Sequence, residues 1–318
     1  MQRSLIVAAA LASIGASAFA QSTVNLYGRL NLTIERQKVG SASNDWKMQN
    51  NSSRFGLKGS EDLGGGMKAG FQIESGFNPA NGTASTPNFW GRQSEVNLGG
   101  GFGMVRLGNF TSEAYYATSD YIGMHNHETG TSSDAFYAYI GRNTNKVAYR
   151  TPGFSGATFE GAVTEGGSLN RTYDFAFNYD AGPLHLGAGY EKNAPNNKNA
   201  KQFAVRGLYE MGAFTFGALI QRDTDGYGIN YGDRTNYRLS GMYALGSTEF
   251  HLNIGHAGDY NKKIGDQSAN QFTVGINQNL SKRTKVYTFY TKVNDKAAVG
   301  QQVYGDFSSF AVGVRHNF

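Results

Sequence analysis

Apolar and polar residues alternate strictly over segment after segment of this chain, and this pattern limits its fold more than any other feature. In the first such segment, Val24, Leu26, Leu30, Leu32 and Ile34 share one parity and polar side chains occupy the other. The pattern returns at 173–179, 202–209, 248–256, 271–277 and 309–318. Side chains of a β-strand point alternately to its two faces, so each segment has an apolar face and a polar face. Alternation repeated this often predicts half-buried antiparallel strands.

The connections between these segments also alternate, in length. Seven are short and rich in Gly, Pro, Asp and Asn, the residues that tight turns require: 63–66, 99–103, 152–156, 180–183, 210–213, 245–247 and 279–282. Eight are longer, polar and irregular: 37–50, 77–88, 109–143, 165–170, 193–199, 224–233, 259–268 and 294–303. Together they predict sixteen strands, with all short turns at one end of the sheet and all long loops at the other.

The N-terminal stretch MQRSLIVAAALASIGASAFA has the order of a secretory signal peptide: a positive residue, an apolar core and a small-x-small motif. Cleavage is expected after Ala20, which leaves residues 21–318 as one domain. A membrane anchor is the alternative, but the apolar core of about 14 residues is shorter than the roughly 20 that a spanning helix needs. The chain contains no cysteine, so neither a disulfide framework nor thiolate chemistry can be proposed.

An alternating sheet can be soluble, with its apolar face packed inside, or can span an outer membrane, with its apolar face toward lipid. Two features favour the membrane. Large charged side chains occupy the polar parity on strand after strand, and aromatic residues such as Tyr149, Tyr209 and Phe214 lie near strand ends on the apolar parity. The sequence therefore predicts an all-β fold, a sixteen-stranded antiparallel transmembrane β-barrel with short periplasmic turns and long extracellular loops.

The last segment alternates up to its final residue, Phe318. Every backbone N–H and C=O group in lipid needs a partner, so a sheet in the membrane cannot keep an open edge. We therefore expect the last strand to pair with the first, at 23–36, and to close the barrel. Phe318 is then expected in the apolar band at the periplasmic rim.

Four stretches of the chain resemble the general porins of beta-proteobacteria: QSTVNLYGRLNLTIE, NNSSRFGLKGSEDLGGGMKAGFQIESGF, FWGRQSEVNLGGGFGMVRLG and VGVRHNF. The resemblance implies a passive, homotrimeric diffusion channel in the outer membrane of a Gram-negative bacterium, surrounded by lipids and lipopolysaccharide. It also implies that the third long loop folds into the lumen and that Phe318 is the signal read by the barrel-assembly machinery. Asn109 and Phe110 stand where members of this family often carry Arg and Gln.

The third long loop, 109–143, is far longer than the usual loop median of about 4–6 residues. Seven aromatic residues lie in it, so we expect it to pack against a surface, and the wall of the lumen is the nearest one. A surface loop that covers a neighbouring subunit is the alternative. If the loop folds inward, its acidic residues become candidates for one side of the pore: Glu113, Asp120, Glu128 and Asp134.

Basic residues dominate the polar parity of the strands and are the candidates for the lining of the pore: Arg29, Arg54, Lys58, Lys68, Arg106, Lys146, Arg150, Arg206, Arg238 and Arg315. A wall with this charge favours anions, while the acidic loop works against it. We therefore expect a water-filled channel for small hydrophilic solutes and ions, with moderate anion selectivity. On this interpretation, replacing Arg106 or Arg150 by Glu should shift selectivity toward cations.

Other kinds of function have weaker support. His125, His127 and Glu128 have the residue types of a zinc site, but they lack a third fixed ligand, so we expect neither a metal nor another cofactor. The sequence has no nucleophile elbow and no phosphate-binding glycine loop, so we expect no catalysis. Its basic residues are spread over many strands, which disfavours nucleic acid binding. A substrate-specific channel, a surface adhesin and an outer-membrane enzyme that uses its long loops remain the alternatives.

Overall fold

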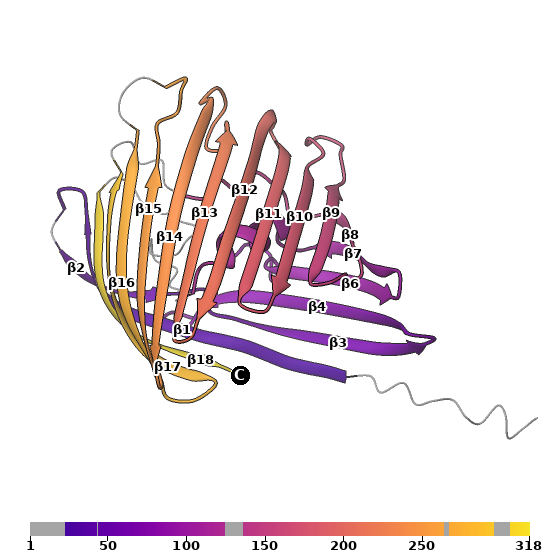
Figure 1. Ribbon diagram of the computed structural model, residues 1–318, viewed down its shortest axis with the longest axis horizontal. Coiled ribbons are helices and arrows are strands. Elements are labelled where there is room, and N and C mark those ends of the chain that lie inside the picture. The colour runs from indigo at the N-terminus through magenta and orange to yellow at the C-terminus, as the bar shows by residue number, and fades with distance from the viewer. Residues whose placement is uncertain (1–22, 43, 125–135, 264–266, 296–305) are drawn as a thin grey trace, which may run out of the picture.

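The computed structural model describes residues 23–318 except residues 43, 125–135, 264–266 and 296–305. The expected signal peptide, 1–20, lies outside the described residues. Almost all of the described chain forms one antiparallel sheet that is closed on itself (Figure 1). Among the described residues, no helix has the length and apolar character needed to cross a membrane.

Sixteen strands make up the wall of the barrel in the described part of the chain: β1 (Thr23–Val39), β3 (Arg54–Gly64), β4 (Met67–Asn78), β6 (Gln93–Gly100), β7 (Gly103–Asn109), β8 (Lys146–Arg150), β9 (Ala157–Thr164), β10 (Tyr173–Ala181), β11 (Leu184–Ala194), β12 (Asn197–Met211), β13 (Phe214–Thr224), β14 (Asp233–Leu245), β15 (Thr248–Ala257), β16 (Ala269–Asn279), β17 (Thr284–Asp295) and β18 (Phe307–Asn317). The short strand β2 (Asp45–Asn50) precedes β3 and also pairs with β1, so β2 and β3 are two parts of one strand interrupted at 51–53. The short strand β5 (Thr83–Ala84) belongs to the second loop.

The first and last strands close the barrel, as the sequence predicts. Strand β1 pairs with β18 from Arg29 opposite Asn317 to Val39 opposite Phe307. At the end of the chain, Phe318 exchanges two backbone hydrogen bonds with Gly28, of 2.9 and 3.0 Å. The ring of Phe318 lies over Gly28 so closely that a Cβ atom there would stand 2.3 Å from it. Glycine at this position therefore makes room for the terminal aromatic ring.

Two of the long connections are shorter than the sequence predicts. The alternation predicts the first loop at 37–50, but β1 runs to Val39 and β2 begins at Asp45. The loop expected at 193–199 is a tight hairpin, since β11 ends at Ala194 and β12 begins at Asn197. Both extensions are rich in polar residues, which mark a loop in a sequence pattern but do not prevent backbone pairing above the lipid.

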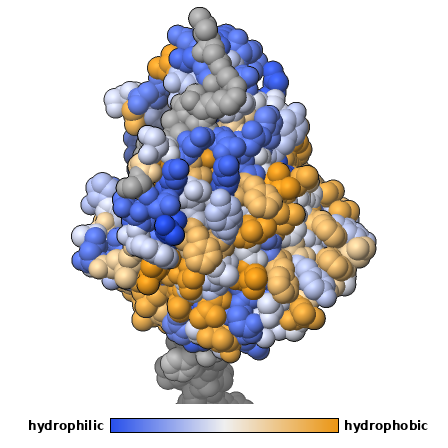
Figure 2. Space-filling view, turned by 90° about the vertical axis from the view of Figure 1, so that its left-hand side faces the viewer, coloured by the Kyte–Doolittle hydropathy of each residue, from blue (hydrophilic) through white to orange (hydrophobic). Residues whose placement is uncertain are grey.

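The two faces of the strands are distributed as the parity of the sequence indicates. Apolar side chains such as Leu30, Phe175 and Val274 are exposed on the outside, whereas their polar neighbours Asn31 and Thr273 are buried inside. Figure 2 shows hydrophobic side chains over the middle and lower part of one face, with hydrophilic side chains above them. The outer surface is therefore an apolar belt that fits the hydrocarbon of a bilayer.

We predict that Val274→Lys lowers the free energy of unfolding by about 2–4 kcal/mol, because a cation on the lipid face must leave water or deform the bilayer. Val274→Met is the matched control, since it has a side chain of similar length without the charge. Unfolding by urea in lipid vesicles measures both. Equal losses for the two variants would show that this face does not lie against lipid.

Candidate functional site

The third long loop folds into the barrel. It connects β7 to β8 and contains a short α-helix, α2 (Glu113–Tyr115), followed by a π-helical turn, η1 (Tyr116–Asp120). The helical segment contacts the inner faces of β10, β11 and β12, and Figure 1 shows it behind these strands. The expected inward fold is therefore present over the described part of the loop, 110–124 and 136–145.

The two ends of the helical segment are held by side chains of opposite charge from the barrel wall. The carboxylate of Asp174 on β10 accepts hydrogen bonds from the backbone N–H groups of Glu113 and Ala114, both at 3.2 Å. The guanidinium of Arg206 on β12 donates a 2.8 Å hydrogen bond to the carbonyl of Ala117. An acid at the N-terminal end and a base at the C-terminal end both match the helix dipole. These contacts fix the height and direction of the segment in the lumen.

Two glycines of β11 allow the helical segment to approach the wall. A Cβ atom at Gly187 would lie 2.1 Å from the carbonyl oxygen of Ala117, and one at Gly189 would lie 2.8 Å from the Cβ of Ala114. Any larger residue at these positions would push the segment toward the centre of the lumen. The width of the pore therefore depends on these glycines as well as on the loop itself.

The returning limb of the loop is held by amide side chains from the next two strands around the barrel, β13 and β14. Gln221 on β13 accepts a 2.9 Å hydrogen bond from the backbone N–H of Ala138 and donates one of 3.2 Å to its carbonyl. Asn236 on β14 donates a 2.8 Å hydrogen bond to the carbonyl of Phe136. Below these contacts an apolar cluster joins the loop to the wall: Ile122 and Tyr137 with Ala204, Leu208 and Leu219. The loop is thus a packed part of the barrel interior.

Between the loop and the opposite wall lies a polar cavity of about 430 Å³. On the barrel side its lining includes Arg29, Arg54 and Arg92. On the loop side it is lined by hydroxyl, amide and acidic residues: Thr111, Ser112, Tyr115, Tyr116, Asp120, Tyr139 and Asn143. A solute that passes through the barrel at this level moves between a basic wall and a neutral-to-acidic one.

The basic wall crosses the seam where the barrel closes. Arg29 on β1 stands directly opposite Arg54 on β3, and Lys285 on β17 stands directly opposite Arg315 on β18. Like charges directly opposite each other on neighbouring strands repel. Glu74 on β4 offsets part of this charge, since its carboxylate lies 2.7 Å from Arg92 and 3.6 Å from Arg54. Four strands therefore carry a band of positive charge along one side of the lumen.

A second charged cluster is largely neutralised within itself. Arg106 on β7 is buried and lies 2.8 Å from Glu95 and 3.0 Å from Glu160, with its guanidinium over the ring of Phe110 at 4.2 Å. Arg150 on β8 lies 2.8 Å from Glu160 and 2.7 Å from Glu113 of the loop. Of these two arginines, only Arg150 keeps a third of its side chain exposed. A glutamate at position 106 would add a further carboxylate to this acidic cluster, so it is a poor probe of pore charge.

The other residues expected to line the pore are spread over three environments. Lys146 is buried 3.5 Å from Asp174, and Arg206 and Arg238 are buried next to the third loop. Lys58 and Lys68 are exposed near the short turns, away from the polar cavity. Asp120 lines the cavity and Glu113 joins the second charged cluster. Glu128 and Asp134, with the histidines His125 and His127, lie outside the described residues.

The alternation of the sequence does not assign two basic residues of the wall, Arg92 and Lys285, to the lumen. Arg92 precedes β6 and follows a loop, so no strand parity assigns it to the lumen, although it stands in the quoted motif FWGRQSEVN. Lys285 shares the inward parity of β17 with the buried aromatic residues Tyr287 and Phe289, so that strand has no clear polar face. Over the described residues, no group of three His, Cys, Asp or Glu side chains is arranged to hold a metal ion.

Two groups in the loop have raised pKa values. Burial raises the pKa of Glu113 above the ordinary glutamate range, although the neighbouring Arg150 and Arg106 act in the opposite direction. Burial and a hydrogen bond to Asp180 raise the pKa of Tyr121 to about 12. Tyr121 therefore stays neutral and donates a 2.7 Å hydrogen bond to Asp180, which holds the loop near the short-turn end.

A closed barrel with an apolar outside, a polar inside and a loop that narrows the lumen defines a channel-forming membrane protein. The comparisons with known proteins agree. A family model described as Gram-negative porin matches residues 7–298. The chain is 31% identical to outer membrane porin protein 32 of Delftia acidovorans and 26% identical to an outer membrane porin protein of Bordetella pertussis, in both cases over the full length of both chains.

A comparison with solved structures also finds a porin. An anion-selective porin from Comamonas acidovorans matches with a TM-score of 0.78 and 26% sequence identity, over 94% of this chain and all of that one. The chain therefore belongs to the Gram-negative porin family. It is a diffusion porin of the outer membrane, as its sequence predicts.

We predict that, as the pH falls, anion preference begins to rise at a pH above the ordinary glutamate range. The raised pKa of Glu113 means that its carboxylate takes up a proton above the ordinary value of roughly 4.3. The neutral acid then no longer offsets the positive charge of Arg150, so the lumen becomes more positive. Reversal potentials in a salt gradient at several pH values measure this effect. Glu113→Gln should reduce the change, and an unaltered pH profile in that variant would contradict the assignment.

Proposed function

We propose that this porin is a general, passive channel for small hydrophilic solutes with a moderate preference for anions. The main support for the anion preference is the cavity that lies between the third loop and the arginines Arg29, Arg54 and Arg92. The anion-selective porin from Comamonas acidovorans, which has the same fold, supports this proposal.

The preference follows from the balance of charges along the route. Arginine keeps its charge at every working pH, so the basic wall does not titrate away. On the other side, Asp120 lines the same cavity, and Glu74 lies 3.6 Å from Arg54 and 2.7 Å from Arg92. Cations are therefore disfavoured but not excluded. Water and salt also screen charges over about 8–10 Å, which keeps the preference moderate.

We predict that Arg92→Gln or Arg54→Gln lowers chloride entry by about threefold at low salt. A unit charge roughly 7 Å from a passing ion in water contributes ~0.6 kcal/mol, which is a factor of about three in rate. Reversal potentials and single-channel currents in planar bilayers measure the effect.

Lys68→Gln is the matched control, because it removes one positive charge from the lumen near the short turns and away from the cavity. That variant should keep most of the wild-type preference. If Lys68→Gln had as large an effect as the two arginine variants, the preference would arise from the total charge of the lumen and not from the cavity. A cation-selective wild-type pore would overturn the proposal.

The same chain is proposed to assemble as a homotrimer through its β1–β4 side. Aromatic residues gather there on outward positions near the long loops: Phe55 lies 6.0 Å from Phe77, 6.1 Å from Phe89 and 6.1 Å from Trp90. Trp46 and Met48 on β2 are also largely exposed. Large aromatic residues are enriched in protein–protein interfaces, so we propose that a second subunit covers this cluster.

We predict that Phe89→Asp yields folded barrels that no longer form trimers, because it puts a charge into this aromatic cluster. Ile229→Asp is the matched control: Ile229 is 61% exposed and Phe89 58%, but Ile229 lies in the loop between β13 and β14. Heat-modifiable bands on gels report folding, and light scattering reports the number of subunits. Wild-type trimer in Phe89→Asp, or equal loss in both variants, would contradict this interface.

Phe318 is proposed to be the residue that the barrel-assembly machinery reads. Its ring is partly exposed at the rim and its backbone pairs with Gly28, so it is presented at the seam of the barrel. Lipids and lipopolysaccharide are the proposed surroundings of the apolar belt. We infer no catalytic function, since the polar groups of the lumen form a route for solutes.

A further inference from the structure

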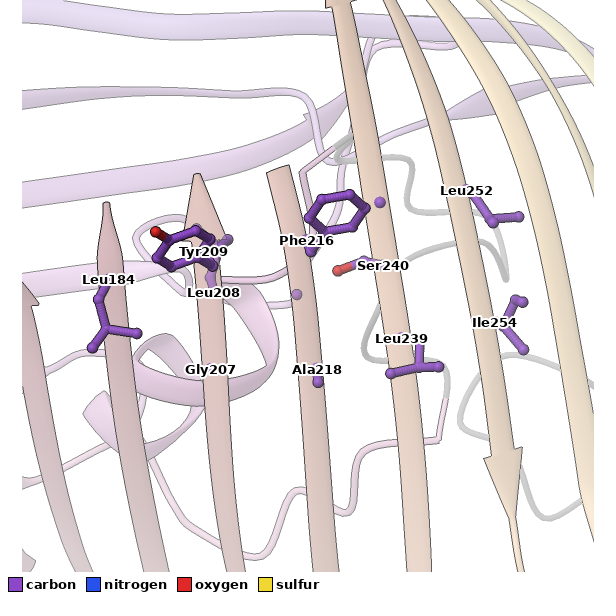
Figure 3. A pocket seen from close by; sticks show the side chains of 12 residues that line it. Leu184, Gly207, Leu208, Tyr209, Phe216, Ala218, Leu239, Ser240, Leu252 and Ile254 are labelled. Carbon is purple, nitrogen blue, oxygen red and sulfur yellow. The ribbon is translucent and has the colours of Figure 1, made fainter. Parts of the chain in front are cut away.

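The outer face of the barrel is hollowed over β11–β15. A cavity of about 440 Å³ lies there, and Figure 3 shows the side chains around it. Its floor consists of three small residues on neighbouring strands. Gly207 on β12 pairs directly with Ala218 on β13, and Gly241 on β14 pairs with Phe216, two residues before Ala218. Larger side chains form its sides: Leu184, Tyr209, Phe216, Leu239, Leu252 and Ile254. We call this feature the outer groove.

The two glycines are not required by the backbone or by close neighbours. A Cβ atom at Gly241 would meet nothing within 4 Å, and one at Gly207 would lie 3.8 Å from Leu186, which is an ordinary contact. Neither glycine has the left-handed backbone conformation that excludes other residues. Glycine inside a strand weakens it and often marks a site that another molecule approaches closely. What the two glycines provide here is the space itself.

The chemistry of the outer groove fits a hydrocarbon chain. Its sides consist of aliphatic and aromatic side chains that are exposed on the outside of the barrel, and its volume lies within the roughly 300–1,000 Å³ of small-molecule sites. The hydroxyl of Tyr209 stands at the end near the short turns, two residues before β12 ends. An apolar ligand with a polar head at that end matches this arrangement.

The outer groove fits within one leaflet of the bilayer. Its lining forms two rows that run across the strands: Leu184, Tyr209, Phe216, Gly241 and Leu252 are paired in one row, and Gly207, Ala218, Leu239 and Ile254 in the next. Four steps between neighbouring strands span about 19 Å. Because strands tilt by about 40° from the barrel axis, a row of this length rises about 12 Å, less than half of the ~30 Å hydrocarbon core. Leu184 follows a short turn directly, since it is the first residue of β11. The groove therefore lies in the leaflet on the side of the short periplasmic turns.

We propose that the outer groove is a binding site for one acyl chain of a phospholipid of the periplasmic leaflet. The inference rests on the proposed function, because it takes the aromatic cluster on β1–β4 as the subunit interface. In the order of strands around the barrel, β12–β14 are separated from β1–β4 by β6–β11 on one side and β15–β18 on the other. The outer groove therefore faces lipid and not a second copy of the chain.

The test compares the whole porin with a variant whose groove is filled, Gly207→Leu combined with Gly241→Leu. Gly161→Leu is the matched control: Gly161 lies on β9, outside the outer groove, and a Cβ atom there would lie 3.4 Å from Phe175. Each protein is incubated in detergent with palmitoyl-oleoyl phosphatidylethanolamine. Native mass spectrometry then counts the phospholipids retained by each trimer as the collision energy rises.

We expect the wild type and Gly161→Leu to retain one phospholipid per barrel, and the filled variant to bind it about tenfold more weakly. Excluding two methylene groups at ~0.8 kcal/mol each gives a loss of this size. Equal retention by all three proteins, or none by the wild type, would overturn the proposal. Loss of the trimer in the filled variant would also overturn it, since the groove would then be a subunit contact. Channel currents of the filled variant, whose lumen is unaltered, report separately on the proposed function.

Discussion

The rest of this structure depends on one requirement, that every backbone polar group in the membrane has a partner. The pairing of β1 with β18 meets it and gives the chain a closed wall with two faces. Closure also brings distant parts of the sequence together, because Arg29 near the start, Arg315 near the end and Arg54 on β3 become neighbours on the inner wall. The basic side of the lumen is thus a consequence of how the barrel closes.

The second determinant is the polar interior, which holds the third loop in a fixed position. Asp174 and Arg206 hold the ends of the helical segment, while Gln221 and Asn236 hold the returning limb. These four side chains lie on β10, β12, β13 and β14, so the loop is pressed against one half of the barrel. The open route for ions is left along the other half, beside Arg54 and Arg92. Loop and wall together therefore determine both the width and the charge of the pore.

The sequence predicts the wall of the barrel much better than its interior. Alternation at a period of two correctly assigns Val274 and Thr273 to opposite faces. The number of short and long connections correctly predicts the number of strands in the wall. The same alternation cannot tell an inward charge that lines the cavity from a buried one, so it ranks Arg106 with Arg54 although Arg106 is buried between Glu95 and Glu160. It also misses Arg92, which stands outside any strand, because its place depends on how a loop enters the lumen. The periodicity of one strand gives the face on which a side chain lies, but it does not show which side chain of another strand or loop contacts it.

The measurement that tests this account most directly is a cross-link between the third loop and the wall. Ile122 of the loop lies against β13, where a Cβ atom at Gly217 would stand 3.1 Å from its own Cβ, close to the spacing of about 3.5–4.5 Å found in disulfides. The chain has no cysteine of its own, so Ile122→Cys with Gly217→Cys gives a single pair. We predict that the bond forms in the folded porin and that single-channel conductance is the same with the bond formed or reduced. Failure of the pair to form a bond, or a conductance that changes when it forms, would show that the loop does not lie against this wall while ions pass.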